Sequence, residues 1–267
     1  SMGAIAGEAC GDIFQPIRKT PMHGWHEANG AHWEPVGHWR RAYAFPRKGE
    51  RVHDAVKREV LATRNSLGLL DASTLGKIDI QGPDAAAFLD FVYCNTFSTL
   101  KENRVRYGLM LREDGIAMDD GTAGRLAEDH FVVTTTTAKA GPVYQHMEFV
   151  RQCLMPDADV QLISTTEAWA QYAVAGPNSR KLLQKIVDPE FDISNEAFEF
   201  MACANITVCG GLRARLFRIS FSGEMAFEIA VPSRYGDALM RKLMEEGEEF
   251  DVVSYGTEAL GVMRIEK

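Results

Sequence analysis

The feature that most constrains this sequence is a strand, a glycine-proline pair and a helix that follow one another twice. The first copy spans residues 77–92 with Gly82 at its turn, and the second spans residues 172–187 with Gly176 at its turn. Proline suits the position after each glycine because the first helical turn needs no N–H donor there. The two copies predict a duplicated α+β chain. Gly-Pro is also a common helix start, so the spacing alone leaves duplication and coincidence open.

Hydrophobic periodicity predicts further elements after residue 50. Apolar residues recur at helical spacing over residues 51–67, and a glycine then ends the helix. Two β-hairpins are predicted, with turns at residues 113–115 and 210–211, where glycine adopts positive φ at little cost. Residues 131–133 are predicted to form another strand, and residues 255–264 a helix.

Composition indicates an ordinary globular protein and excludes several classes of partner. The 267 residues, 46% hydrophobic and 25% charged, suffice for one or two packed domains. The net charge of −8 disfavours nucleic acids and anionic membranes, because both carry negative charge. No apolar run is long enough for a membrane helix and no signal peptide is recognisable, so we expect a cytoplasmic protein without a membrane partner.

The cysteines and histidines give no sign of a cross-linked or metal-stabilised fold. The five cysteines are odd in number and contain no C-x-x-C pair, which argues against a disulfide framework and a structural zinc site. We expect them to be reduced and mostly buried. The four histidines within residues 1–50 have spacings that fit no zinc arrangement, so no metal site is predicted.

We expect three regions along the chain. Residues 1–50 form an arm rich in tryptophan and histidine, whose aromatic side chains are expected to anchor it on another domain or subunit. Residues 51–165 form a first α+β half and residues 166–267 a second. Because the chain stops inside an amphipathic helix, we expect the second half to be truncated and the chain to be a piece of something longer.

Three acidic side chains are candidates for chemistry. Asp119 and Asp120 are adjacent at the end of a short strand, and neighbouring acids make it costly to ionise both, which poises one as a base. The alternative is a solvated Asp-Asp-Gly turn. Glu224 lies between two strands, and a carboxylate can accept paired N–H bonds from the edge of an amino-pyrimidine. The alternative is a solvated hairpin tip.

Two other positions are candidates for binding. Arg264 on the last helix can pair with a substrate carboxylate, although a helix often places arginine in solvent. The threonines of residues 134–137, with Thr135 as the candidate, either end a strand as plain β-formers or line a polar cavity with hydroxyls. The sequence contains no Walker-type loop, no G-x-G-x-x-G and no G-x-S-x-G, so it offers no support for phosphoryl transfer, a dinucleotide fold or a serine hydrolase.

Several stretches, taken in order, resemble one family. The chain is similar to the C-terminal, folate-binding region of the α subunit of heterotetrameric sarcosine oxidases, which itself resembles the glycine cleavage T protein, an aminomethyltransferase. The likeness covers nearly the whole chain and is carried by residues 69–85, 106–110, 118–121, 134–137, 217–224 and 255–258. It implies an α+β, T-protein-like folate-binding fold with two pseudo-repeated halves, in which the small C-terminal β-barrel domain that usually follows is absent.

The resemblance also assigns roles to residues. Asp120 matches the catalytic aspartate of the family, Tyr107 matches a tyrosine that lines the folate site, and Glu224 matches the glutamate that holds the pterin ring. Arg264 falls where the family has an arginine near the folate tail. Residues 256–264 depart from the Gly-x-Gly-Ala-Arg-Asp pattern of the T protein, which favours the sarcosine oxidase branch.

The implied function is capture of the one-carbon unit of oxidised sarcosine by tetrahydrofolate, as 5,10-methylene-tetrahydrofolate. Flavin and NAD would be bound elsewhere in the parent complex, so this chain alone is not expected to oxidise sarcosine. The implied partners are tetrahydrofolate, the rest of an α chain and the other sarcosine oxidase subunits. Two alternatives stay open: a non-catalytic folate-binding or docking module, and a stand-alone aminomethyltransferase.

Overall fold

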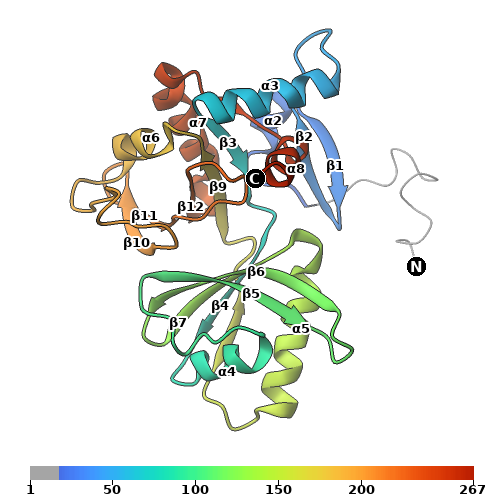
Figure 1. The fold of residues 1–267 in the computed structure, drawn as a ribbon, viewed down its shortest axis with the longest axis vertical. Coiled ribbons are helices and arrows are strands. Elements are labelled where there is room, and N and C mark those ends of the chain that lie inside the picture. Colours follow the sequence, from blue (N-terminus) through green and yellow to red (C-terminus); the bar gives the residue numbers. More distant parts are fainter. Residues whose placement is uncertain (1–17) are drawn as a thin grey trace, which may run out of the picture.

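The computed structural model describes residues 18–267, which form two lobes, each built around one sheet (Figure 1). The lower lobe in Figure 1 has a five-stranded antiparallel sheet of order β5-β6-β7-β4-β8. Its strands are β4 (Gly76–Gln81), β5 (Arg104–Leu111), β6 (Ala117–Ala127), β7 (His130–Thr135) and β8 (Gln161–Ser164). Helices α4 (Ala85–Val92) and α5 (Ala140–Phe149) cover one face of this sheet and bury a core with Ile78, Ile80, Phe88, Phe131 and Met147.

The upper lobe has a six-stranded sheet of order β10-β11-β12-β9-β3-β13. Its strands are β3 (Gly68–Asp71), β9 (Trp169–Ala175), β10 (Cys203–Val208), β11 (Leu212–Phe217), β12 (Ala226–Pro232) and β13 (Val253–Ser254). Helices α6 (Ser179–Ile186) and α7 (Gly236–Gly247) pack on one face, and α3 (Val52–Asn65) and α8 (Thr257–Ile265) pack on the other. Within residues 18–267 no sheet closes on itself.

Two successive parts of the chain repeat one order of elements, as the two Gly-Pro units predict. The order α3-β3-β4-α4-β5-β6-β7 returns as α5-β8-β9-α6-β10-β11-β12. The first strand of each repeat joins the sheet that the other repeat forms: β3 pairs with β9, and β8 pairs with β4. Gly82 and Gly176 have φ of +128° and +116°, and a Cβ there would lie 2.2 Å and 2.4 Å from a backbone oxygen. Only glycine suits both turns.

Because of this strand exchange, the two lobes do not coincide with the two halves expected from the sequence, residues 51–165 and 166–267. Helix α3 and strand β3 lie in the upper lobe, since β3 pairs with β9 and α3 packs with α8. The chain therefore crosses between the lobes at residues 72–75 and again at residues 165–168. Neither the repeat nor its turns reveals the exchange in sequence, because strand pairing is a long-range property.

Residues 18–50 belong to the upper lobe. They form α2 (His23–Ala28) and a hairpin of β1 (His32–Val36) and β2 (Trp39–Ala44). Met22 is fully buried in the core of the six-stranded sheet, and His26 hydrogen-bonds Asp71 at 2.9 Å. The aromatic side chains expected to anchor an arm therefore pack, from residue 18 onward, against this chain's own upper lobe. The remainder of the expected arm, including Cys10, lies outside the described residues.

A buried carboxylate fixes the start of α8. Glu59 is fully buried in α3, and its two oxygens accept the backbone N–H groups of Phe45 at 2.7 Å and Gly256 at 2.9 Å. A Cβ on Gly256 would lie 1.9 Å from the carbonyl oxygen of Tyr43, so the chain approaches β2 as closely as glycine permits. Together these contacts hold α8 against the hairpin and the upper sheet.

The lobes meet through the face of the lower sheet that α4 and α5 leave free. Apolar residues of both lobes form one buried cluster there, in which Val105 and Val132 meet Cys203 and Phe217. Beside it, Arg215 of β11 donates two hydrogen bonds to Asp79 of β4, at 2.9 Å and 2.7 Å. Apolar packing and an ion pair therefore fix the lobes to each other.

The cysteines depart from expectation in their burial. Cys203 is buried, whereas Cys94, Cys153 and Cys209 are exposed, and all four are free. The prediction of mostly buried cysteines is therefore wrong for the described residues. Cys94 follows α4, Cys153 lies in the π-helical turn Val150–Leu154 after α5, and Cys209 lies in the β10–β11 turn, where side chains meet solvent. No helix within residues 18–267 has the length and apolar character to cross a membrane.

Candidate functional site

A cavity of about 360 Å³, called here the upper-lobe cavity, lies beside the upper sheet and α8, and Thr136 and Thr137 of the lower lobe also line it. This volume is within the roughly 300–1,000 Å³ of small-molecule sites. Most of its wall is apolar, as expected for a site that buries a ring system. Its lining residues include Arg41, Leu70, Thr136, Thr137, Ala173, Phe221, Glu228, Tyr255 and Arg264.

Glu228 is the one carboxylate among the described residues that line this cavity. It lies on β12 opposite Ala173 of β9, and Ala173 lies opposite Leu70 of β3, so all three share the face that the cavity touches. The side-chain amide of Gln171 donates a hydrogen bond to Glu228 Oε2. Burial raises the pKa of the Glu228 carboxyl, and the bond from Gln171 and the charge of Lys77 oppose that rise.

Glu224, the glutamate that the resemblance assigned to the pterin, lies outside the cavity lining. It follows the exposed turn after β11, and its Oε1 is 3.5 Å from the guanidinium of Arg64, which also pairs with Glu266 at 2.5 Å. The structure therefore brings Glu228, rather than Glu224, to the cavity. The sequence signal that could have found Glu228 is a lone acid in the otherwise apolar stretch 226–231.

Two arginines line the cavity, and their charges are used differently. Arg41 donates to Glu34 at 2.5 Å and 3.0 Å and to the hydroxyl of Thr137 at 3.2 Å. Arg264 lies over the ring of Phe221, 5.7 Å from its centroid, and Phe221 is half exposed. Because Arg41 is already paired, Arg264 is the cation at this cavity with a charge to offer a ligand.

Tyr107 and Asp120 are brought together, as expected for residues of a shared site. The Tyr107 hydroxyl donates to Asp120 Oδ2 at 2.9 Å, and burial together with this bond raises the pKa of Tyr107. Strand register puts both side chains on the same sheet face as Asp79, which pairs across to Arg215. The pair thus stands on the face that looks toward the upper lobe, though neither residue lines the cavity itself.

The Asp119 side chain lies on the opposite face of β6 from Asp120, where it binds the chain at Thr136. Its carboxylate accepts hydrogen bonds from the Thr136 backbone N–H at 3.1 Å and the Thr136 hydroxyl at 2.7 Å. Burial raises the pKa of Asp119, against these bonds. Thr135 is buried and donates to the Thr136 carbonyl at 3.0 Å. Asp119 and Thr135 therefore support the cavity wall at Thr136 without lining it.

Comparison with known proteins identifies relatives across the whole chain. A model of the GCVT N-terminal domain matches residues 22–267. The sarcosine oxidase subunit alpha of Rhizobium meliloti (strain 1021) is 52% identical over 269 residues, which cover 100% of this chain and 27% of that protein. The subunit alpha of Corynebacterium sp. (strain P-1) is 47% identical over 267 residues, again 100% of this chain and 28% of the relative. The chain thus spans about a quarter of the length of these relatives.

Among solved structures, the glycine cleavage system aminomethyltransferase T from Bartonella henselae superposes with a TM-score of 0.79 at 26% identity. The match covers 94% of this chain and 62% of that one. The expected T-protein-like α+β fold is confirmed by this match. From the family model and these relatives, the chain belongs to the GCVT N-terminal domain family.

Proposed function

We propose that the upper-lobe cavity binds tetrahydrofolate, with the carboxylate of Glu228 against the pteridine ring. The observation that carries the proposal is one carboxylate in an otherwise largely apolar cavity of ligand size. The 2-amino group and N3–H of a pterin are two parallel donors, and a carboxylate accepts such a pair with good geometry. The apolar wall around it, which includes Leu70 and Ala173, suits the flat faces of the ring.

The folate tail would run toward the mouth of the cavity at Phe221 and Arg264. Phe221 offers an exposed aromatic face, and Arg264 offers a guanidinium to the glutamate carboxylates of the tail. The position of Arg264 in the cavity lining supports the tail role that the resemblance assigned to it. In this proposal Glu228 takes the pterin role, in place of Glu224.

Asp120 is proposed as the catalytic residue of one-carbon capture. The folate N5 lone pair would add to the iminium carbon of oxidised sarcosine, and Asp120 would take up the N5 proton as the C–N bond forms. Asp120 would return this proton to the glycine nitrogen, so that glycine leaves as the amine while the N10 lone pair bonds to the one-carbon unit. Loss of the N10 proton, which the released glycine amine takes up, then leaves 5,10-methylene-tetrahydrofolate. Tyr107, bonded to Asp120 Oδ2, would hold the carboxylate in place. Holding both reactants in one site would contribute more than the carboxylate alone.

The parent reaction is proposed from the relatives. Sarcosine oxidase α subunits at 52% and 47% identity support a role beside a flavin enzyme whose flavin and NAD lie outside this chain. The other sarcosine oxidase subunits and the rest of an α chain are then the proposed partners. The aminomethyltransferase similarity supports folate as the acceptor of the carbon.

The binding proposal is tested by anaerobic calorimetric titration of tetrahydrofolate into the chain. We expect binding to the wild-type chain, and Glu228→Gln to weaken it about 10- to 100-fold because a charged acceptor is lost. Glu224→Gln, a matched change outside the cavity, is expected to leave the affinity unchanged. Absence of binding by the wild-type chain, or a loss that follows Glu224 instead of Glu228, would contradict the proposal.

A further inference from the structure

We propose that Lys77 and Gln171 are positioning residues that hold the Glu228 carboxylate anionic and in one orientation toward the cavity. This inference rests on the proposed binding of a folate, because it names the groups that make Glu228 a fit acceptor for the pterin edge. Neither residue lines the cavity. Each is therefore proposed to influence a ligand only through the Glu228 carboxylate.

Gln171 determines the orientation. Its side-chain amide donates to Glu228 Oε2, which leaves Oε1 and the remaining lone pairs for a ligand. Gln171 itself is held by Ser73, because its backbone N–H donates to the Ser73 hydroxyl at 3.0 Å and its carbonyl accepts from that hydroxyl at 3.3 Å. These bonds fix the Gln171 backbone, and because the residue is 2% exposed, packing leaves its side chain little freedom to turn.

Lys77 supplies the charge. It is 2% exposed, and its ammonium donates to the carbonyls of Ser73 at 3.0 Å and Leu75 at 2.9 Å, both in the first crossing between the lobes. No carboxylate within residues 18–267 forms an ion pair with it at hydrogen-bonding distance. The nearby charges of Asp71 and Glu228 favour its charged form, and burial lowers the pKa of Lys77 to about 8. A buried charge is costly unless it is compensated, so the Lys77 ammonium and the nearby acids Asp71 and Glu228 stabilise each other's charged forms.

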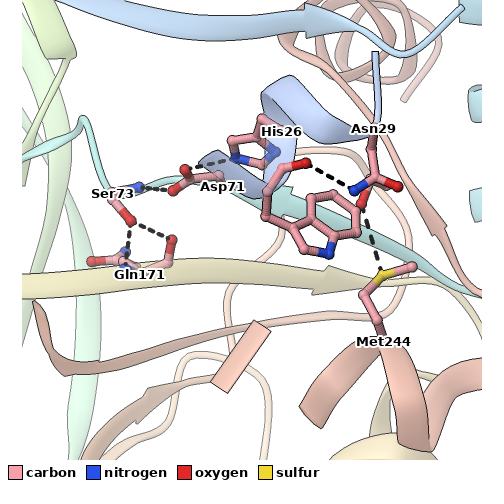
Figure 2. A network of polar contacts seen from close by, with 8 residues as sticks. His26, Asn29, Asp71, Ser73, Gln171 and Met244 are labelled. Atoms are coloured by element: carbon pink, nitrogen blue, oxygen red, sulfur yellow. Dashed lines mark hydrogen bonds and ion pairs between the residues drawn. The ribbon is translucent and has the colours of Figure 1, made fainter. Parts of the chain in front are cut away.

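The charge of Lys77 also acts on Asp71, but Asp71 has hydrogen-bond partners of its own. Figure 2 shows Asp71 between His26 and Ser73, with His26 Nε2 at 2.9 Å from Oδ2 and the Ser73 N–H at 3.0 Å from Oδ1. Burial opposes ionisation of Asp71, but its hydrogen bonds with His26 and Ser73 leave its pKa below the usual value. Among the described residues, the Glu228 carboxylate accepts a side-chain hydrogen bond from Gln171 alone, and the charge of Lys77 is the other influence that opposes the rise of its pKa.

Other ionisable groups around Glu228 do not replace Lys77. Arg41 and Arg264 line the same cavity, but Arg41 is paired with Glu34 and Arg264 lies over Phe221 at the mouth. Tyr255 also lines the cavity, and burial raises its pKa, with the Glu228 charge adding to the rise, so it stays neutral. Of the residues that the structure describes, Lys77 is therefore the cation whose charge favours the Glu228 carboxylate, and its ammonium binds the carbonyl of Ser73, whose hydroxyl contacts the Gln171 backbone.

The test measures the protonation of Glu228 directly. Difference infrared spectroscopy follows the carbonyl stretch of a protonated carboxyl as pH falls, and its loss in Glu228→Gln assigns the band. We expect Lys77→Met to raise the midpoint by about one pH unit or more, and Lys77→Arg to restore it. Gln171→Met, which keeps the side-chain length and removes the donor, is expected to raise the midpoint less. Each variant is first checked for native circular dichroism and melting.

Tetrahydrofolate titrations over the same pH range give the second readout. The affinity is expected to fall as Glu228 protonates, so in Lys77→Met the fall begins at a higher pH. The loss against wild type should reach about 10-fold for each pH unit by which the midpoint has risen. In Gln171→Met we also expect the tetrahydrofolate affinity to be lower than in wild type by a factor that does not vary with pH, because the Glu228 carboxylate loses its fixed orientation at every pH. In a Glu228→Gln background, Lys77→Met should no longer change how the tetrahydrofolate affinity depends on pH.

The two readouts separate the inference from the proposed function. An unchanged infrared midpoint in both Lys77→Met and Gln171→Met would overturn the inference, even if tetrahydrofolate binds normally. A shifted midpoint supports it, and a wild-type chain that fails to bind tetrahydrofolate at any pH then contradicts only the proposed function. If Lys77→Met does not fold, the midpoint in Gln171→Met decides.

Discussion

Replacing Arg215 with methionine is expected to lower the free energy of unfolding by about 3–5 kcal/mol, the usual cost of leaving a buried charge unpaired. Arg215 and Asp79 are 7% and 6% exposed, and they share two hydrogen bonds across the lobe interface. The guanidinium also lies over the ring of Trp169, 4.1 Å from its centroid. After the substitution, Asp79 keeps a hydrogen bond from the Thr165 hydroxyl at 3.4 Å and the approach of His130 at 3.6 Å.

The loss should depend on pH in a defined direction. Burial raises the pKa of Asp79, but the nearby His130 and the two bonds from Arg215 outweigh it and leave the pKa below its usual value. The wild-type pair therefore stabilises the fold at neutral pH, and this contribution disappears as pH falls through that lowered pKa. In the Arg215→Met variant the Asp79 pKa rises, so the deficit against wild type should shrink as acid protonates Asp79.

Urea unfolding followed by circular dichroism at pH 7 and pH 5 measures this effect. The control is the double variant Arg215→Met with Asp79→Leu, which removes both charges and should recover part of the loss. A single variant as stable as wild type at pH 7, or a double variant less stable than the single one, would refute the role given to this pair.

Replacing Asp120 with asparagine is expected to slow formation of 5,10-methylene-tetrahydrofolate by about 10²–10⁴-fold, the usual contribution of a positioned acid or base. Asparagine keeps the shape and the acceptor for Tyr107 but cannot take up the N5 proton. Oxidation of the amine substrate should be unaffected, because this chain is not proposed to bind the flavin.

The measurement is made in the proposed multisubunit enzyme, and methylene-tetrahydrofolate and the oxidised product are quantified together. Tyr107→Phe should reduce transfer less than Asp120→Asn, since it removes only the bond that orients the carboxylate. Asp114→Asn, in the exposed β5–β6 turn, serves as the matched control. Unchanged transfer in Asp120→Asn would remove Asp120 from the mechanism.

Local sequence signals predicted much of the fold. Helices α4 and α6, the strands before them and both hairpin turns follow from periodicity, proline and glycine within short windows, and the structure has them. The exchange of β3 and β8 between lobes could not be predicted, because it depends on which distant strand each one pairs with.

The candidate site was predictable in part for the same reason. Tyr107 and Asp120 are brought within hydrogen-bonding distance by the predicted hairpin, so local reasoning sufficed. The carboxylate of the cavity could not be predicted without knowing which sheet face each residue occupies. In the structure Glu228 lies beside Ala173, whereas Glu224 pairs with Arg64. The buried charges of Lys77 and Glu59 likewise depend on contacts between elements far apart in the chain.

The most direct test of the proposed folate site is a crystal structure of the chain with tetrahydrofolate. We expect the pteridine ring in the upper-lobe cavity, its 2-amino and N3 donors on the Glu228 carboxylate, and its tail toward Arg264 and Phe221. A second hollow exists between α3 and α8, lined by Val56, Val60 and Arg64 among others. A folate bound there, or held by Glu224 instead of Glu228, would contradict the proposed site.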